Sequence, residues 1–421
     1  MKILVIGSGL IGVTSAYYLM CQGHDVVVLD RASGPGLETS FANGALLTPS
    51  MSEPWNAPGS WRVLLTSLAQ PSSPLKLRLR AVPSLAGWGL EFLRNSEPDI
   101  FRRNTLINLH FALHSLQVMN SLREHTGVAY GRSAKGTLRL FRNGRSFAEA
   151  LVTANRLVDS GIRFKQLSSS AMTALEPSLA PIAKSVMGAI HYESDEMGDA
   201  HAFCVALANY LGQQGVHFHF RKSVEELEVR GRQIVSAIAD GERFIADQYV
   251  VAAGSYSTPI FSQVGLRLPV RPAKGYSVTF DMRDRPTSLR IPVVDDQLHA
   301  VVVPVGNSIR AAGTAEFAGY RRNMDSARIR NLLRLARQVL PEEPLDPQTA
   351  RPWCGLRPMS ADGVPIIGPT PIANLWVNTG HGHLGWTLAA GSAKLLAELV
   401  SDATPSTNPA PFLLSRFRGS R

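Results

Sequence analysis

Apolar runs separated by glycines dominate the start of the chain. Residues 3–6 are apolar, and residues 13–22 carry a helical pattern that ends at Gly23. Residues 26–29 form a second apolar run, which is closed by Asp30. Short apolar runs bounded by turn residues are typical of buried strands, and a glycine after a periodic stretch marks the end of a helix. The pattern therefore predicts a strand–helix–strand unit at the N-terminus.

The same two periodicities divide the rest of the chain. Apolar positions every three to four residues predict helices, and short alternating or apolar segments predict strands. Asp199 stands where a helix N-cap is expected. Helices are predicted over residues 61–68, 84–94, 105–124, 146–160, 200–214, 326–340 and 387–400. Strands are predicted over residues 136–141, 216–220, 248–253, 276–280, 299–304, 308–313 and 375–378, with a hairpin group over 224–245 and a frayed tail over 403–421.

Size and composition indicate two domains in a reducing compartment. The 421 residues exceed one ordinary hydrophobic core. Cys21, Cys204 and Cys354 are odd in number and far apart, so neither a disulfide framework nor a zinc-binding spacing is visible. The N-terminal apolar run is typical of a strand rather than a signal peptide, and no apolar stretch is long enough to span a bilayer. These features favour a cytoplasmic protein.

The net charge of +10 leaves two kinds of partner open. A basic chain attracts either nucleic acid or an anionic membrane or substrate. The basic residues are scattered and no basic motif is interleaved with aromatic residues, so nucleic acid is set aside. Residues 74–80 are basic and precede the apolar, tryptophan-containing segment 85–93. Such a segment either rests on the inner face of the cell membrane or forms an ordinary surface helix over the core.

The glycine turn between the first strand and the first helix carries the clearest chemistry. Gly7, Gly9 and Gly12 have the G-x-G-x-x-G spacing of dinucleotide-binding units, and Asp30 ends the second strand. In such units the glycines permit the tight turn, the approach of a pyrophosphate and close helix packing, while the acid binds a ribose. The positive end of the helix then faces the phosphates. The alternative is a glycine-rich turn in another kind of α/β protein.

Two later stretches are also rich in small or polar residues that could lie close to a cofactor. Thr39, Ser40, Asn43 and Gly44 suit a backbone that wraps closely around a cofactor, although a capped helix start at residue 39 or 40 fits the same residues. Residues 378–387 are rich in glycine and contain two histidines. No third ligand accompanies these histidines, so we expect no metal site there.

Together these motifs resemble the FAD-dependent D-amino acid oxidase superfamily over nearly the whole chain. Within it, the chain is most similar to the small, catalytic subunits of bacterial D-amino acid dehydrogenases. Besides the glycine turn and Asp30, the resemblance rests on LETSFANG (37–44), EPWNAPG (53–59), KGTLRLF (135–141), DEMGD (195–199), VVAAG (250–254), KGYSVTF (274–280), GLRPMSADGVPIIG (355–368) and NTGHGHLGWT (378–387).

The resemblance implies an α/β fold with FAD as the cofactor. A Rossmann-like, discontinuous FAD-binding domain would be joined to a second α+β substrate domain built on a mostly antiparallel sheet. The FAD-binding domain would comprise residues 1–50, 195–265 and 351–402. The substrate domain would comprise residues 51–194 and 266–350, leaving 403–421 as a tail.

The resemblance also places residues around the cofactor. The ADP half would be held by Gly7, Ser8, Gly9, Leu10, Ile11, Gly12, Asp30 and Arg31, with Val224 on the adenine side. The pyrophosphate and flavin would be lined by Thr39, Ser40, Asn43 and Gly44. The flavin side would be completed by Gly254, Gly355, Gly380, His381, Gly382 and His383.

The substrate site is expected around Arg357. A buried carboxylate favours a bidentate guanidinium, and Arg357 matches the carboxylate-binding arginine of the glycine oxidase branch. Tyr276 matches a region where relatives place an aromatic residue near the substrate, but a buried core tyrosine fits equally. His383 stands where some relatives carry a second arginine, so it either contacts substrate or only packs. Cys354 lies near a flavin-attachment position of some sarcosine oxidases, and a buried free thiol is the simpler interpretation.

The expected reaction is the oxidative deamination of a D-amino acid. A hydride would pass from the α-carbon to flavin N5, and the electrons would go to a quinone or another acceptor that is not oxygen. A D-proline or cis-4-hydroxy-D-proline dehydrogenase remains an alternative, also as the catalytic subunit of a hetero-oligomer. Glycine or sarcosine oxidase is a third option. A flavin-binding scaffold without a substrate is disfavoured by the intact glycine turn and Arg357.

Overall fold

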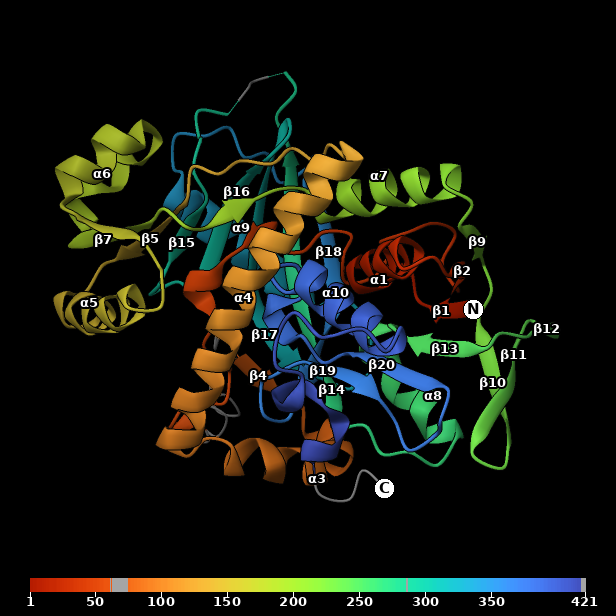
Figure 1. Cartoon of the computed structure of the whole chain (residues 1–421). Helices are drawn as coiled ribbons and strands as arrows, with labels where there is room; N and C mark the ends of the chain where they lie inside the picture. Colours follow the sequence, from red (N-terminus) through yellow and green to blue (C-terminus); the bar gives the residue numbers. More distant parts are fainter. Residues whose placement is uncertain (61, 63–74, 285–286, 418–421) are drawn as a thin grey trace.

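Two large sheets form the framework of the molecule, with helices packed around them (Figure 1). The computed structural model describes residues 1–60, 62, 75–284 and 287–417. Apart from residue 62, the helix predicted over residues 61–68 lies outside the described residues. The mixed α/β architecture with one mostly parallel and one mostly antiparallel sheet confirms the predicted fold class.

The first sheet contains the N-terminal strand–helix–strand unit. Strand β1 lies between β2 and β13 in parallel register, and only β19 runs antiparallel. These central strands are buried on both faces, which explains why their sequences are continuous apolar runs. In spatial order the strands are β19 (Ile366–Pro369), β20 (Leu375–Thr379), β13 (Gln248–Val251), β1 (Lys2–Ile6), β2 (Asp25–Asp30) and β9 (His217–Phe220).

Helices cover one face of this sheet. Helix α1 (Leu10–Cys21) packs between α10 (Ala389–Val400) and α7 (Ala200–Gln213). Asp199 caps α7 as predicted, because its side chain accepts hydrogen bonds from the amides of His201 and Ala202. On the other face lie α8 (Ser257–Gln263) and the predicted hairpin group, a small antiparallel sheet of β10 (Val224–Arg230), β11 (Gln233–Ala239) and β12 (Glu242–Phe244).

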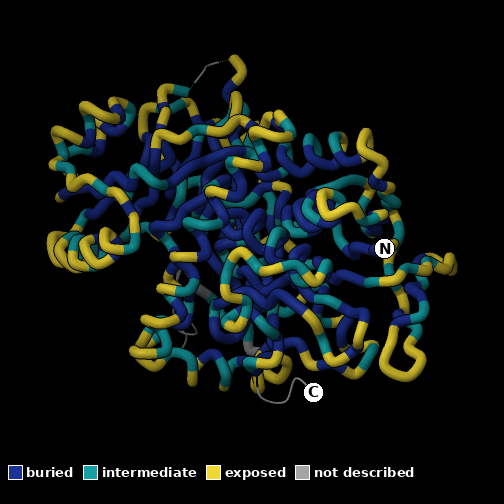
Figure 2. Tube along the Cα trace, in the orientation of Figure 1, coloured by how far each residue is buried: buried dark blue, intermediate teal, exposed yellow. Residues whose placement is uncertain are grey.

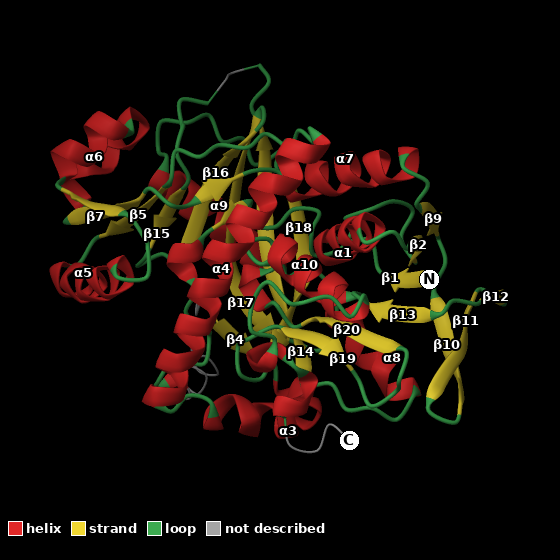
Figure 3. Ribbon diagram, in the orientation of Figure 1, coloured by secondary structure: helices red, strands yellow, loops and turns green. Residues whose placement is uncertain are grey.

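The second sheet is mostly antiparallel and has nine strands. Helix α9 (Ser326–Val339) packs on one face of it, while α5 (Gly144–Val158) and α6 (Ser169–Leu175) lie at the β5–β7 end (Figure 3). Its path is β18 (Arg351–Ser360), β14 (Val270–Asp281), β17 (Ser308–Phe317), β16 (Ala300–Val305), β15 (Val293–Asp295), β5 (Thr137–Phe141), β7 (Gly188–Tyr192) and β6 (Phe164–Leu167), with β4 (Leu75–Leu77) beside β17. The short strands β3 (Leu46–Leu47) and β8 (Glu196–Met197) pair separately.

Two elements cross the predicted division of the chain. Strand β18 was assigned to the FAD-binding part, yet it pairs along its length with β14 in the nine-stranded sheet. Helix α4 (Pro98–Thr126) was assigned to the substrate part, yet it packs against α10 and places Phe111 and Met119 in the core of the first sheet. Burial is therefore continuous between the two sheets, as Figure 2 shows.

The prediction of a frayed tail is wrong for the described part of it. Phe412 is 2% exposed and packs against Phe111 with 4.3 Å between ring centroids. Arg416 forms an ion pair of 2.7 Å with Asp362. Three closely spaced apolar residues, Phe412, Leu414 and Phe417, are buried and anchor the tail to the core.

Helix α3 (Val82–Arg94) buries the aromatic residues that made its composition resemble a membrane-surface segment. Trp88 and Phe92 point into the core, and the indole nitrogen of Trp88 donates to the Met359 carbonyl at 3.1 Å. Arg78 is not a free surface charge, because it pairs with Glu316 and Asp325. Within the described part of the chain, no helix has the length and apolarity needed to cross a membrane.

Candidate functional site

A large cavity lies where the two sheets meet. Its volume is about 870 Å³, and its walls come from the β1–α1 turn, the 38–48 loop, β14, β17, β18 and the 379–386 segment. Most of the predicted site residues line it: Gly7, Gly9, Leu10, Ile11, Asp30, Arg31, Thr39, Ser40, Asn43, Gly44, Val224, Gly254, Tyr276, Gly355, Arg357, His381, Gly382 and His383. Ser8, Gly12 and Gly380 are not among the residues that line it.

The β1–α1 turn opens one end of the cavity. Gly7 has a φ of +111°, and a Cβ built on it would lie 2.7 Å from the Ala252 carbonyl oxygen. A Cβ on Gly12 would collide with the Gly7 backbone. Helix α1 has no capping side chain at Gly9 and no acid in its first turn, so its positive end faces the cavity unneutralised. This is the environment that a pyrophosphate requires.

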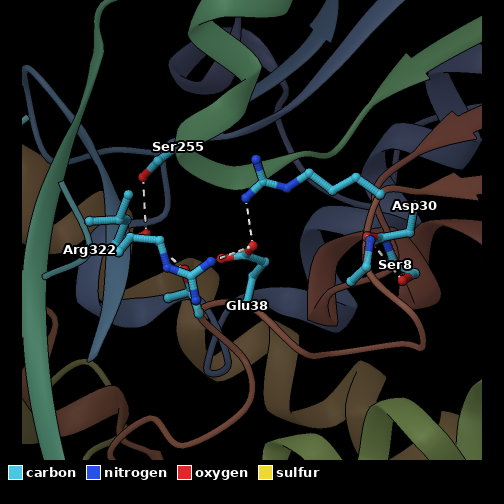
Figure 4. A network of polar contacts seen from close by, with 9 residues as sticks. Ser8, Asp30, Glu38, Ser255 and Arg322 are labelled. Carbon is cyan, nitrogen blue, oxygen red and sulfur yellow. Dashed lines mark hydrogen bonds and ion pairs between the residues drawn. The ribbon is translucent and has the colours of Figure 1, made fainter. Parts of the chain in front are cut away.

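Asp30 is held rigidly at the edge of this turn. Its Oδ2 accepts hydrogen bonds from the amide and the hydroxyl of Ser8, both at 2.6 Å, and its Oδ1 accepts from the Ala32 amide at 2.8 Å (Figure 4). A carboxylate has about four acceptor positions, so Asp30 keeps capacity for ribose hydroxyls. Ser8 therefore holds the Asp30 carboxylate in place through two hydrogen bonds.

A bridge of charges closes the same end of the cavity. Glu38 pairs with Arg31 at 2.5 Å and with Arg322 at 2.9 Å (Figure 4). The guanidinium of Arg31 lies 3.6 Å above the ring of Tyr256, which also borders the cavity. These contacts join the first sheet to the segment after β17.

The loop after Glu38 is fixed from both sides. Ser277 on β14 donates to the Ala42 carbonyl at 2.7 Å, and Thr39 donates to the Leu356 carbonyl at 2.8 Å. The alternative of a helix start at residue 39 or 40 is wrong. The Ser40 hydroxyl instead accepts a hydrogen bond of 3.1 Å from the Leu10 amide at the start of α1.

Arg357 dominates the other end of the cavity. It projects from β18, and its guanidinium lies over Gly275, where a Cβ would collide with Nη1. Nη1 is buried without a hydrogen-bond partner, and no carboxylate of the described residues forms an ion pair with this side chain. Burial lowers the pKa of Arg357 to about 10, so the group remains charged at neutral pH. A partly buried cation without a paired carboxylate is suited to bind an anionic ligand.

The two histidines of the 379–386 segment are neutral. Burial lowers the pKa of His381 to about 3 and that of His383 to about 4, with the charge of Arg357 contributing to the second shift. His383 lies 3.0 Å from the Met51 carbonyl and stacks on Trp55. His381 contacts Ser392 through Nε2 and leaves Nδ1 without a partner. No group of three or more His, Cys, Asp or Glu suited to a metal occurs among the described residues.

Tyr276 does not present its hydroxyl to the cavity. The hydroxyl donates to Glu316 at 2.6 Å, on the face of the sheet that α9 covers, and Lys274 pairs with the same carboxylate at 3.0 Å. Cys354 is paired opposite Tyr276 and shares that face. Of the two interpretations of Tyr276, the structure supports the buried core tyrosine, and Cys354 is a buried thiol.

Three residues of the cavity wall near Arg357 were not predicted as site residues, although Trp55 lies within the EPWNAPG motif (53–59). Trp55 lies 5.5 Å from the Arg357 guanidinium, and His299 and Thr314 border the same end. Thr314 lies beyond the predicted end of its strand at residue 313. His299 and Thr314 both have positive φ angles, +48° and +57°, which no residue-type pattern predicts for a histidine and a threonine.

A buried acid supports the wall from behind. Asp195 accepts hydrogen bonds from the hydroxyls of Ser50 and Thr137, both at 2.6 Å, next to Met51 of the cavity wall. Burial nonetheless raises its pKa to about 6. Asp195 is thus a fully buried carboxyl group that takes up a proton more readily in the folded chain than in the unfolded chain.

We expect this carboxyl to weaken the fold as the pH rises. The pKa of Asp195 in the folded chain lies above its value of about 4 in the unfolded chain. The stabilisation by its proton is therefore fully present below about pH 4. As the pH rises through about 6 the proton is lost, and the free energy of unfolding falls by about 3 kcal/mol. Asp195→Asn should therefore flatten the dependence of the unfolding free energy on pH in this window. Urea unfolding of both proteins between pH 4.5 and 7 measures this, and parallel curves would contradict it.

Comparison with known proteins agrees with this geometry. The profile of the family described as FAD dependent oxidoreductase (DAO) matches residues 2–399. A D-amino acid dehydrogenase of Paramagnetospirillum magneticum is 40% identical over 402 residues, which cover 95% of both chains. One of Granulibacter bethesdensis is 37% identical over 419 residues, covering 100% of both chains.

Solved structures share the fold. The glycine oxidase of Geobacillus kaustophilus superposes with a TM-score of 0.75 at 23% identity, covering 99% of this chain and 100% of its own. The L-proline dehydrogenase of P. horikoshii also gives 0.75, at 16% identity, covering 99% of this chain and 97% of its own. Three features of the site fit FAD: the glycines of the β1–α1 turn, the positive N-terminus of α1 without an acid in its first turn, and the Asp30 carboxylate held by hydrogen bonds. The chain belongs to the DAO family of FAD-dependent oxidoreductases.

Proposed function

We propose that this protein is a D-amino acid dehydrogenase. It oxidises D-amino acids at the α-carbon and passes the electrons to a quinone or another acceptor that is not oxygen. The observation that carries the proposal is the unpaired guanidinium of Arg357 at the end of the cavity away from the dinucleotide turn. Full-length relatives named D-amino acid dehydrogenase support the same substrate class.

The side chains around Arg357 would bind and orient rather than exchange protons. Arg357 would hold the substrate carboxylate in a bidentate pair, which fixes the direction of the Cα–H bond. His381 and His383 are neutral and so add no second cation. Trp55 and Trp386 border the cavity and would exclude water. FAD, when bound, supplies the ring that accepts a hydride from the α-carbon.

The proton balance needs no protein base. The substrate amine loses its extra proton to solvent before oxidation, and its lone pair forms the C=N bond as the hydride leaves. The imino acid is then hydrolysed by water to a keto acid and ammonia. The carboxylates among the described cavity-lining residues are Asp30 and Glu38. Asp30 is held by Ser8 and Ala32, and Glu38 pairs with Arg31 and Arg322.

Anaerobic bleaching of the flavin tests the proposal. The purified protein is mixed with D-alanine, D-valine, D-phenylalanine, D-proline, cis-4-hydroxy-D-proline, glycine and sarcosine, with L-alanine as the control. We expect rapid bleaching by several D-amino acids and none by L-alanine. Bleaching by the two ring compounds alone would instead identify a D-proline or hydroxyproline dehydrogenase. A yellow protein that nothing bleaches would contradict the proposal for the isolated chain and point to a required partner subunit.

We propose that the part of the chain around the first sheet binds the cofactor and the part around the second sheet binds the substrate. Residues 1–50, 195–265 and 361–402 would hold FAD, and residues 51–194 and 266–360 would hold the substrate. This keeps the expected division except that β18, with Arg357, moves to the substrate part. The pairing of β18 with β14 supports the change.

We further propose that α3 places the protein on the inner face of the cell membrane, where a quinone is available. Its outward face carries Val82, Leu90 and Leu93, which are 40%, 52% and 42% exposed. Arg80 and Arg94 flank them and are also exposed. Apolar side chains beside cations suit the surface of an anionic bilayer.

Vesicle sedimentation checks this surface. Leu90→Ser combined with Leu93→Ser should reduce co-sedimentation with phosphatidylglycerol vesicles several-fold, because the apolar contact is lost. The matched control is Val152→Ser combined with Val158→Ser on α5, where the residues are 52% and 48% exposed. Equal binding of the α3 variant and the wild type would mark α3 as an ordinary surface helix.

A further inference from the structure

A distorted position in β17 borders the cavity near Arg357. The pairing of β17 with β14 shifts register between Gly275, which faces Ala315, and Tyr276, which faces Gly313. Thr314 is the extra residue of this β-bulge. Its φ of +57° is a left-handed conformation that β-branched residues rarely adopt. Bulges next to active sites often serve to redirect one side chain.

The bulge carries a polar group that forms no hydrogen bond with any residue that the structure describes. Thr314 lines the cavity, is only 8% exposed, and its hydroxyl has no hydrogen-bond partner among the described residues. A threonine in an ordinary strand would place its hydroxyl near a backbone group or in water. A strained conformation that buries an unpaired hydroxyl is unfavourable for the free energy of folding. A bound ligand that accepts a hydrogen bond from this hydroxyl would offset that cost.

The second unpaired group of this region, the Arg357 guanidinium, lies close to Thr314 on the same sheet. Arg357 extends over Gly275, and Gly275 is paired with Ala315, the neighbour of Thr314. Strands β18, β14 and β17 are adjacent in that order, so the two groups flank Gly275 from either side. Both Arg357 Nη1 and the Thr314 hydroxyl can donate hydrogen bonds. Two buried donors without acceptors fit one anionic ligand.

We propose that Thr314 is a substrate-binding residue, whose hydroxyl donates a hydrogen bond to the carboxylate that Arg357 holds. This inference rests on the proposed function and deepens it. The carboxylate has about four acceptor positions, so it accommodates two donors from the guanidinium and a third from Thr314. The third donor fixes the rotation of the carboxylate about the bond to the α-carbon. The substrate class is thereby restricted to amino acids with a free, unesterified carboxylate.

The matched variants are Thr314→Val, which keeps the branched shape and the backbone strain, and Thr314→Ser, which keeps the hydroxyl. Each FAD-loaded protein is assayed with D-alanine and a dye as electron acceptor. It is also titrated anaerobically with propionate, a carboxylate without an amine, by the shift in flavin absorbance. For Thr314→Val we expect about a tenfold rise in the KM for D-alanine and in the Kd for propionate, with kcat within about twofold of the wild type. Thr314→Ser should match the wild type.

The outcomes separate binding from folding. Thr314→Gly relieves the positive φ, so it should keep or raise the Tm while weakening propionate to the same extent as Thr314→Val. An unchanged Kd for propionate in Thr314→Val would overturn the carboxylate contact, even if the KM for D-alanine rose. A lower Tm in Thr314→Gly together with weaker propionate binding would overturn it in favour of a structural role.

The same titration distinguishes this inference from the proposed function. If no D-amino acid reduces the wild-type flavin, the proposed function fails. If D-amino acids reduce it and Arg357→Met weakens propionate while Thr314→Val does not, only the inference about Thr314 fails.

Discussion

Arg357→Met is expected to raise the KM for D-alanine by at least about 100-fold. Each charge-assisted hydrogen bond to a carboxylate contributes about 1.5–3 kcal/mol, and the guanidinium offers two. Their sum of about 3–6 kcal/mol corresponds to a factor of at least about 100 in affinity. The kcat should also fall, by a smaller factor, because the α-carbon loses its fixed orientation. Steady-state kinetics with a dye acceptor measures both constants.

The same substitution should not weaken the fold. Nη1 of Arg357 is buried without a partner, so the free protein bears the cost of an uncompensated charge. Methionine fills a similar volume without that cost, and the Tm of the FAD-loaded variant should be equal to or above that of the wild type. Lost catalysis with retained stability is the signature of a ligand-binding cation.

A matched control lies on the same strand. The Arg351 side chain is 77% exposed at the start of β18 and lies 4.0 Å from the Asp281 carboxylate. Arg351→Met should leave the KM and the Tm near their wild-type values. Unchanged kinetics for Arg357→Met would remove Arg357 from the substrate site.

Gly9→Val is expected to abolish FAD retention and leave the chain folded. Gly9 has φ −71° and ψ −176°, an extended conformation that any residue adopts. A Cβ at this position would lie 3.3 Å from the Ser40 hydroxyl, which bonds the first amide of α1, so the valine side chain would crowd this space. This is the position where the pyrophosphate approaches the helix N-terminus. The variant should purify colourless, with absorbance at 450 nm near zero and a far-ultraviolet circular dichroism spectrum like that of the wild-type apoprotein.

The neighbouring glycines would give a different result. Gly7 and Gly12 each meet backbone atoms, so a side chain at either position distorts the turn itself. Gly212 in α7 provides the neutral control, since it has open space and no positive φ. Gly212→Ala should retain FAD and gain slightly in stability, by up to about 1 kcal/mol. A yellow, fully loaded Gly9→Val protein would refute the assignment of this turn.

The sequence alone determined the features that depend on neighbours along the chain. The strand, the glycine turn, α1, β2 and Asp30 follow from a local pattern of apolar runs and from the conformational freedom of Gly7. The Asp199 cap of α7 and the hairpins of β10 to β12 are equally local. Short-range periodicity and turn chemistry are sufficient for such elements, because their hydrogen bonds close within a few residues.

The tertiary structure decided which side chains meet. In β14 and β18 successive residues face opposite sides, so Arg357 enters the cavity while Tyr276 and Cys354 turn toward α9. The choice of side is set by pairing between segments that are about 80 residues apart, and a sequence pattern does not contain it. Packing against the core likewise fixed Trp88 inward and anchored the tail through Phe412. Thr314 depends on tertiary structure most of all, since its bulge exists only where β17 slips by one residue against β14.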